Sequence, residues 1–133
     1  MGRTVSLAAL CLFAGLALGS PGAQQQPIKR TDLLKVELPD MKDTEMHVWV
    51  GDVAPNAAIS RHTHPTPRFV YIVEGALVLE MEGKPAQTFK AGEAFVEMPD
   101  QVHSLRNASA TEPAKAIGFQ YAAKGQPLQN NAP

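Results

Sequence analysis

RHTHPTPRFVYIVEGAL, residues 61–77, combines a His-x-His pair with an apolar run and a Glu-Gly turn. Side chains alternate along a β-strand, so His62 and His64 face the same side, about 6.6 Å apart along the chain. Two imidazoles placed in this way can converge on one cation, at about 2.1 Å from each nitrogen. An exposed or hydrogen-bonded pair of histidines has the same spacing. The runs RFVYIV and ALVLEME flank Glu74-Gly75, which predicts a β-hairpin.

The two-residue period of this stretch continues on both sides of it. Short runs with alternating apolar residues are separated by turns rich in glycine and proline, and no window sustains an amphipathic helix. This pattern predicts an all-β domain, either a sandwich or a barrel. The other predicted strand segments are EMHVWVGDV (45–53), AISRHTH (58–64), AQTF (86–89), AFVEM (94–98), VHSLRN (102–107) and AKAIGFQY (114–121).

The first 23 residues have the pattern of a secretion signal. Arg3 precedes an apolar run from Val5 to Leu18, and small residues follow that run. The run is shorter than the roughly 20 residues that a membrane span needs. We expect cleavage after Gly19 or Ala23, and therefore an exported protein, periplasmic or secreted, with no membrane span after the signal is removed.

The rest of the chain is predicted to form one small domain. The only cysteine, Cys11, lies within the predicted signal, so the mature chain has no disulfide. Twelve basic and 13 acidic residues nearly balance, which does not favour nucleic acid as a partner. We expect a flexible lead-in and first strand over 24–40, a barrel over 41–123 and a loose tail over 124–133.

A third histidine, His103, lies where the last predicted strands begin. The chain around the histidines resembles the cupin superfamily. The first cupin motif places a glutamate three or four residues after His-x-His, and a glycine after six more residues. Here His62, His64 and Gly75 match, while Arg68 stands at the position of the glutamate.

The second cupin motif is matched less completely. Gly92, His103 and Asn107 occupy motif positions, while Met98 stands at the proline position and Asp100 at the glycine position. Because the two motifs occur in order with the predicted hairpin between them, the resemblance covers most of the mature chain.

The resemblance implies a jelly-roll barrel of two antiparallel sheets. It also implies one divalent metal ion in the barrel, with His62, His64 and His103 as ligands. The sequence does not identify the ion, which could be iron, manganese, copper, zinc or nickel. Members of this superfamily catalyse several reactions and others only bind small molecules, so the fold alone does not define the function.

Arg68 changes the electrostatics of such a site. Arginine has no lone pair to offer a metal and stays charged. At about 6 Å and an effective dielectric constant of about 20, its charge and a divalent ion repel by roughly 5 kcal/mol. Three arrangements resolve this conflict: an anionic ligand bridges the metal and Arg68, a protein carboxylate such as Glu97 compensates, or the histidines and Arg68 form a polar pocket without metal.

These residues predict an exported cupin that binds a divalent metal and acts on a small, carboxylate-bearing molecule held by Arg68. The reaction could be oxidative, as in a dioxygenase-like oxidoreductase, but no general base or nucleophile stands out. The alternative is a non-catalytic cupin that binds a small anion or a sugar, with or without metal.

The segment 68–73 also predicts a homodimer. If Arg68, Val70 and Ile72 face the barrel interior, the apolar residues between them face outward and could pack against a second sheet. The alternative cover for this face is the N-terminal segment, through Leu33, Leu34 and Val36.

Overall fold

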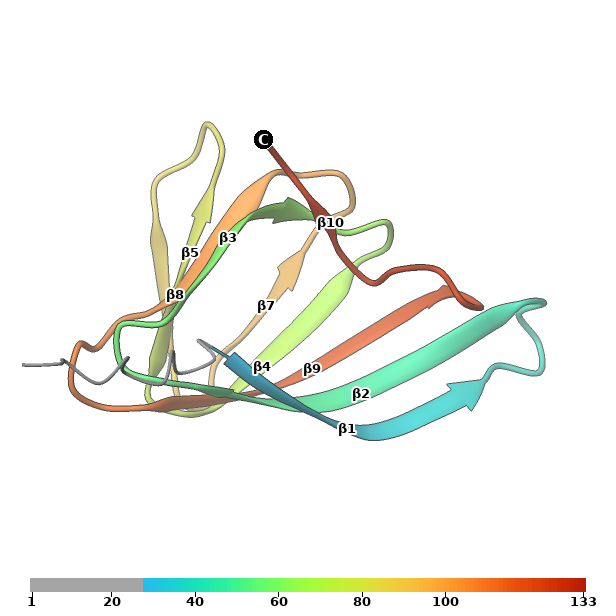
Figure 1. The fold of residues 1–133 in the computed structure, drawn as a ribbon, viewed down its shortest axis with the longest axis horizontal. Coiled ribbons are helices and arrows are strands. Elements are labelled where there is room, and N and C mark those ends of the chain that lie inside the picture. The colour runs from blue at the N-terminus through green and yellow to red at the C-terminus, as the bar shows by residue number, and fades with distance from the viewer. Residues whose placement is uncertain (1–27) are drawn as a thin grey trace, which may run out of the picture.

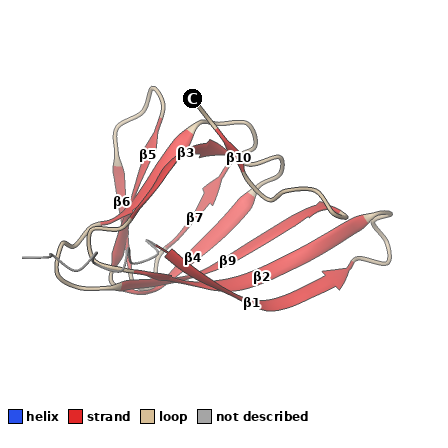
Figure 2. Ribbon diagram, in the orientation of Figure 1, coloured by secondary structure: helices blue, strands red, loops and turns tan. Residues whose placement is uncertain are grey.

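The structure is a computed structural model that describes residues 28–133, which form ten strands and no α-helix (Figures 1 and 2). Two five-stranded antiparallel sheets face each other as a jelly-roll barrel. Sheet A has the order β1-β2-β9-β4-β7, and sheet B has the order β10-β3-β8-β5-β6. The strands are β1 (Ile28–Glu37), β2 (Thr44–Val53), β3 (Ala58–Thr63), β4 (Arg68–Glu74), β5 (Ala76–Met81), β6 (Gln87–Lys90), β7 (Ala94–Glu97), β8 (His103–Asn107), β9 (Ala114–Ala123) and β10 (Asn130–Asn131).

The strand segments alternate between core and solvent as their sequences predict. In β4, Arg68, Val70 and Ile72 are buried, while Phe69 and Tyr71 are exposed. Strand β9 buries every second residue in the same way. The predicted all-β class and the direction of the β4 side chains are therefore confirmed.

Two turns depend on special backbone angles. Gly75, between β4 and β5, has φ of 71°, and a Cβ atom at this position would lie 2.8 Å from the carbonyl oxygen of Pro113. Only glycine fits such a position without strain. Asp100 has φ of 57°, and aspartate is among the few other residues that adopt this region readily. This conformation explains how Asp100 can stand where the second cupin motif has glycine.

The apolar part of the core fills the barrel between the sheets. Ile72 and the other members of the cluster are almost fully buried, and they come from both sheets. This packing supplies most of the stabilisation, because each buried aliphatic side chain contributes about 1.5–3 kcal/mol. The cluster comprises Val53, Ala57, Val70, Ile72, Leu77, Leu79, Leu105, Ala114 and Ala116.

The C-terminal segment differs from the loose tail predicted for 124–133. Strand β10 pairs with β3 at the edge of sheet B, with Asn130 opposite Thr63. The carbonyl oxygen of Leu128 also accepts hydrogen bonds from buried side chains inside the barrel. The prediction was wrong because the segment attaches through its backbone, and backbone attachment leaves no apolar period in the sequence. Figure 1 shows the segment running from the end of β9 to β3.

Residues 28–37, the described part of the N-terminal segment, do not cover the outer face of β4. Strand β1 is the edge strand beside β2, and its own Leu33, Leu34 and Val36 are exposed. The predicted signal over 1–23, with both cleavage positions, and the start of the lead-in lie outside the described residues. Within residues 28–133, no helix meets the length and hydropathy that crossing a membrane requires.

Candidate metal centre

The three histidines that the sequence singled out lie together in the barrel interior. His62 and His103 stand opposite each other on β3 and β8, and His64 follows the end of β3. Their ring centres are 4.3 to 4.9 Å apart. At most 2% of each residue is exposed. Their candidate ligand atoms all lie within 4.8 Å of one another, which suits a metal ion.

Backbone carbonyl groups determine which nitrogen of each ring carries the proton. The Nδ1 atom of His62 lies 2.7 Å from the carbonyl oxygen of Ser60, and that of His103 lies 2.8 Å from the carbonyl oxygen of Gln101. The Nδ1 atom of His64 lies 2.8 Å from the carbonyl oxygen of Leu128. A carbonyl oxygen only accepts, so each Nδ1 must donate. In the neutral rings, the three Nε2 atoms therefore carry bare lone pairs.

These Nε2 atoms face one another and a carboxylate. The Oε2 atom of Glu97 is 3.1 Å from Nε2 of His64, and Oε1 is 3.4 Å from Nε2 of His103. All three Nε2 atoms and Oε2 of Glu97 are buried without a hydrogen-bond partner. Buried polar atoms are rarely left unpaired, because desolvation without a partner costs about 1–3 kcal/mol each. Three converging lone-pair donors with a carboxylate beside them need a positive charge between them.

A proton satisfies this arrangement only in part. One proton on His103 or His64 can pair with Glu97, but Nε2 of His62 lies next to other nitrogen atoms and has no carboxylate contact. A divalent ion between the three imidazoles satisfies their Nε2 atoms together, and the carboxylate of Glu97 beside His64 and His103 balances part of its charge. Imidazole nitrogen with a nearby carboxylate is a donor set that zinc, iron, copper and nickel accept. The residues present therefore fit a metal ion.

Glu97, which the sequence suggested as a compensating carboxylate, reaches this site from the strand next to Arg68. The two residues are directly opposite in the β4–β7 register, and their side chains are 3.8 Å apart. Burial raises the pKa of Glu97, but the adjacent imidazoles of His103 and His64 and the charge of Arg68 outweigh it and lower the pKa to about 2. Glu97 is therefore ionised at neutral pH. Of the three arrangements that the sequence left open for Arg68, the geometry favours the one with Glu97.

The imidazoles respond to the same environment in opposite directions. Burial lowers the pKa of His62 to about 4, with the neighbouring histidines adding to the effect against the carbonyl of Ser60. Burial also acts to lower the pKa of His103, but the adjacent carboxylate of Glu97 raises it above the usual value. A neutral His62 can serve as a metal ligand over the whole physiological pH range.

Arg68 is held by two acceptors at the edge of the site. Its Nε donates to Oε1 of Gln120 at 2.9 Å, and its Nη2 donates to the carbonyl oxygen of Leu128 at 3.2 Å. Burial lowers the pKa of Arg68 to about 10, while Glu97 raises it and Arg30 lowers it further. Arg68 stays charged at neutral pH, and its side chain borders an internal cavity.

The sequence did not predict two of these contacts. Gln120 is fully buried on β9, where it also donates from Nε2 to the carbonyl oxygen of Leu128 at 2.9 Å. The sequence did contain a feature that could have identified Gln120, because it is the polar residue on a strand face that otherwise carries only alanine and glycine. The carbonyl of Leu128 had no signal, since every residue has one.

A small internal cavity of about 60 Å³ adjoins the site. It reaches His62, Glu97 and Arg68 at one end, and Trp49 and Ile28 lie on its other walls. A volume of this size admits a few heavy atoms, so only a small ligand, or one end of a longer one, fits within it in this conformation.

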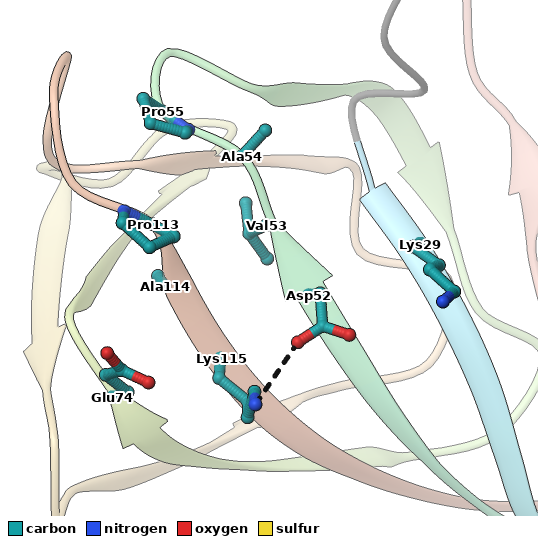
Figure 3. A pocket seen from close by; sticks show the side chains of 9 residues that line it. All are labelled: Lys29, Asp52, Val53, Ala54, Pro55, Glu74, Pro113, Ala114 and Lys115. Carbon is teal, nitrogen blue, oxygen red and sulfur yellow. Dashed lines mark ion pairs between the residues drawn. The ribbon is translucent and has the colours of Figure 1, made fainter.

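A larger hollow of about 560 Å³ lies elsewhere, where β2 ends and β9 begins (Figure 3). Its floor is apolar and includes Pro55 and Pro113, and its rim carries charges of both signs. Lys115 and Asp52 pair there at 3.5 Å (Figure 3). None of the three histidines borders this hollow, so its size does not make it the functional site.

Comparisons with known proteins agree with this geometry. Solved structures with a similar fold include a cupin-like protein from Thermotoga maritima MSB8, with 22% identity over 74% of this chain and 77% of that chain, TM-score 0.59. They also include the DMSP lyase DddQ from Ruegeria pomeroyi DSS-3, with 17% identity over 92% of this chain and 59% of that chain, TM-score 0.64. A third is the polyketide cyclase RemF from Streptomyces resistomycificus, with 19% identity over 80% of this chain and 71% of that chain, TM-score 0.61.

These likenesses establish the fold and not a reaction. The chain spans only 59% of DddQ, and 44% of a chain in the structures of the DMSP lyases RdDddP and RnDddQII. No curated protein matches the sequence. Residues 49–118, more than half of the chain, match the family model described as a cupin domain. The segment includes all three histidines, Arg68 and Glu97, and the chain therefore belongs to the cupin domain family.

Proposed function

We propose that the protein binds one divalent metal ion through His62, His64, His103 and Glu97. The observation that carries this proposal is the set of three converging imidazole nitrogens, buried without hydrogen-bond partners, with the unpaired Oε2 of Glu97 beside His64. The carboxylate that the first cupin motif usually supplies comes here from the neighbouring strand, at the residue opposite Arg68.

We further propose that the metal site takes a small carboxylate-bearing molecule. With a divalent ion, three neutral histidines, ionised Glu97 and protonated Arg68, the formal charge of the site is +2, which favours an anion. Arg68 is suited to receive one, because a guanidinium group forms bidentate, charge-assisted hydrogen bonds with a carboxylate. Gln120 and Leu128 hold the guanidinium group in place from the other side.

The reaction we favour is oxidation of that anion. A bound metal ion supplies Lewis-acid polarisation and, if it is redox-active, electron transfer. The protein's own residues orient the carboxylate through Arg68, keep Glu97 ionised and exclude water through the apolar walls of the cavity. Lyase and cyclase activities among proteins of similar fold mean that the fold does not select oxidation.

Non-catalytic binding is the second candidate function. It is favoured by one observation: the titratable side chains on the cavity wall, His62, Glu97 and Arg68, are either proposed ligands or the proposed anion clamp. No side chain on the wall is then left to transfer a proton. Oxygen uptake and product formation by metal-loaded protein with simple carboxylates distinguish the two, because a binding protein shows saturable binding and no turnover.

The proposal also includes export and a homodimer. The N-terminal pattern supports export to the periplasm or the medium, and the exposed apolar residues on β4 support the dimer. Mass spectrometry of protein recovered from its native compartment should give a chain that begins after Gly19 or Ala23. An intact N-terminus in exported protein would contradict the signal.

A further inference from the structure

Trp49 is the residue that connects the metal site to the edge of sheet A. It points into the barrel from β2 and is 7% exposed. The indole lies flat against Gly118 of β9, where a Cβ atom would be 2.3 Å from the ring. Glycine at this position lets the ring pack directly on the backbone. The indole is therefore held in one place beside the cavity, which it lines.

Two arginines contact this one ring. The Cζ atom of Arg30 lies 3.7 Å from the ring centre, and that of Arg68 lies 5.1 Å from it. Both are within the range of a cation–π interaction. Arg30 belongs to the edge strand β1, opposite Gly51 of β2.

The two guanidinium groups are close enough to affect each other. The charge of Arg30 is one of the causes that lower the pKa of Arg68. Glu97 is directed to the histidines as well as to Arg68, so it does not neutralise both arginines. Among the contacts within residues 28–133, the side chain of Arg30 has no hydrogen bond and no ion pair within 4.0 Å, although Asp32 is near enough to act on it through charge.

The cavity borders Arg68 and the indole of Trp49. Its wall includes His62, Glu97 and Arg68 together with Trp49, Ile28 and Gly51. Arg30 does not line the cavity but contacts the same indole, so a ligand that starts at the metal and passes Trp49 extends beyond the cavity to reach Arg30.

We propose that Arg30 is a second anion-binding residue and that the ligand is a short dicarboxylate. One carboxylate lies between the metal site and Arg68, and the other pairs with Arg30 at the edge of sheet A. This inference rests on the proposed function for the first carboxylate and adds the second. Two cations on one aromatic ring select a molecule with two acidic groups over one with a single group.

The test uses the only tryptophan of the chain as its reporter. Zinc-loaded mature protein is titrated with acetate, propionate, malonate, succinate and glutarate at constant ionic strength, and the fluorescence of Trp49 is followed. We expect the best dicarboxylate to bind about tenfold or more tightly than the monocarboxylates, since each charge-assisted hydrogen bond contributes about that much. Equal binding of both classes by the wild type would overturn the inference.

Three variants separate Arg30 from its surroundings. Arg30→Gln should lose most of the preference for dicarboxylates and keep its affinity for acetate. Arg30→Lys, which keeps the charge, should fall in between. Lys29→Gln is the matched control, because this neighbouring residue borders the hollow at the other end of the barrel and should leave the preference unchanged.

The results distinguish this inference from the proposed function. An undiminished dicarboxylate preference in Arg30→Gln overturns the role of Arg30 and leaves it as a stacking partner of Trp49 only. If acetate binds equally to wild type and Arg68→Ala, the proposed anion site at Arg68 fails instead. A thermal midpoint within a few degrees of wild type verifies that each variant is folded.

Discussion

The two sheets of the barrel contribute different chemistry to the same site. Sheet B supplies the imidazoles, with His62 on β3 and His103 on β8. Sheet A supplies Arg68, Glu97 and Gln120 from three adjacent strands. The neutral metal-binding groups and the charged groups therefore lie on opposite walls. A metal ion between the walls would connect sheets that otherwise contact each other mainly through apolar side chains.

The outer faces of the sheets also differ. On sheet B, the charged residues are paired with each other: Arg61 with Glu82, and Arg106 with Glu80, both at 3.0 Å. On sheet A, the outer face is apolar and continuous across the strands. It includes Phe69, Tyr71, Val73, Val96 and Phe119, each 37% to 49% exposed.

The register of sheet A makes this apolar face one surface. Phe69 stands opposite both Val96 and Phe119, and Phe119 stands opposite Val48. Monomeric proteins rarely expose a contiguous apolar patch of this kind. The comparison indicates that the outer face of sheet B is suited to contact with solvent. The outer face of sheet A is suited to pack against a second copy of the chain, as the proposed homodimer requires.

The largest expected effect is loss of the proposed dimer when a charge is placed on the outer face of sheet A. Tyr71→Glu would bury an unpaired carboxylate in the proposed interface, which costs several kcal/mol. The mass measured by light scattering should change from dimer to monomer, while the circular dichroism of the strands persists. Arg106→Gln, on the outer face of sheet B, is the control and should leave the mass unchanged. A monomeric wild type would refute the dimer.

A smaller effect, on the stability of the fold, is expected when a side chain is added on the inner face of sheet A. Gly118→Ala places a Cβ atom against Trp49 and should destabilise the fold by about 1–3 kcal/mol through overpacking. Gly51→Ala is the matched control, because its Cβ would meet only Ile28, at 3.9 Å. Chemical denaturation followed by Trp49 fluorescence compares the two. Equal stability of both variants would contradict the close packing of the indole.

Substitutions of Arg68 test whether the charged wall of the site binds an anion. Arg68→Ala should weaken binding of acetate to metal-loaded protein by about tenfold, since it removes a charge-assisted pair. Arg68→Lys keeps the charge but not the planar fork, and should fall between alanine and wild type. Calorimetric titration measures the three affinities. An affinity of Arg68→Lys equal to that of Arg68→Ala would mean that charge alone contributes nothing.

The smallest effect is a shift in pH dependence. The raised pKa of His103 means that the metal-free protein keeps a proton on this ring at higher pH than free imidazole does. A metal ion must displace that proton. As the pH is lowered, metal affinity should therefore begin to decrease while the pH is still above 6.5, by up to about tenfold per pH unit. His62, with a pKa of about 4, adds no competition near neutral pH.

Glu97→Gln provides the matched comparison for this pH dependence. It removes the group that raises the pKa of His103, so the onset of the fall should move to lower pH. Competition with a metal chelator between pH 5.5 and 8 measures both proteins. The same onset in both would exclude Glu97 as the cause.

The sequence predicted the parts of the molecule that depend on local pattern. Alternation in β4 gave the correct inner and outer residues, and the motif spacing identified the three histidines that converge. Glu97 was suggested by its closeness to the second motif. Its position opposite Arg68 depends on the register between β4 and β7, which local pattern does not encode.

The remaining contacts had little or no local signal. Gln120 meets Arg68 because β9 lies next to β4, and these strands are far apart in the sequence. The C-terminal segment was predicted to be loose because it lacks an apolar period. It is instead held by the carbonyl of Leu128, which accepts three hydrogen bonds from buried donors. Backbone acceptors are present at every position, so composition cannot reveal which of them is used.

The metal content of the protein tests the central claim most directly. The protein is purified from its native source without a histidine tag, and bound metals are measured by elemental analysis together with those of His103→Ala. We predict about one divalent ion per chain in the wild type. In His103→Ala, affinity should fall by more than the roughly 10–100-fold that loss of an outer-shell partner costs, so that the purified variant carries no metal. A wild type that stays metal-free after incubation with each candidate ion, or a full complement of metal in His103→Ala, would contradict the account.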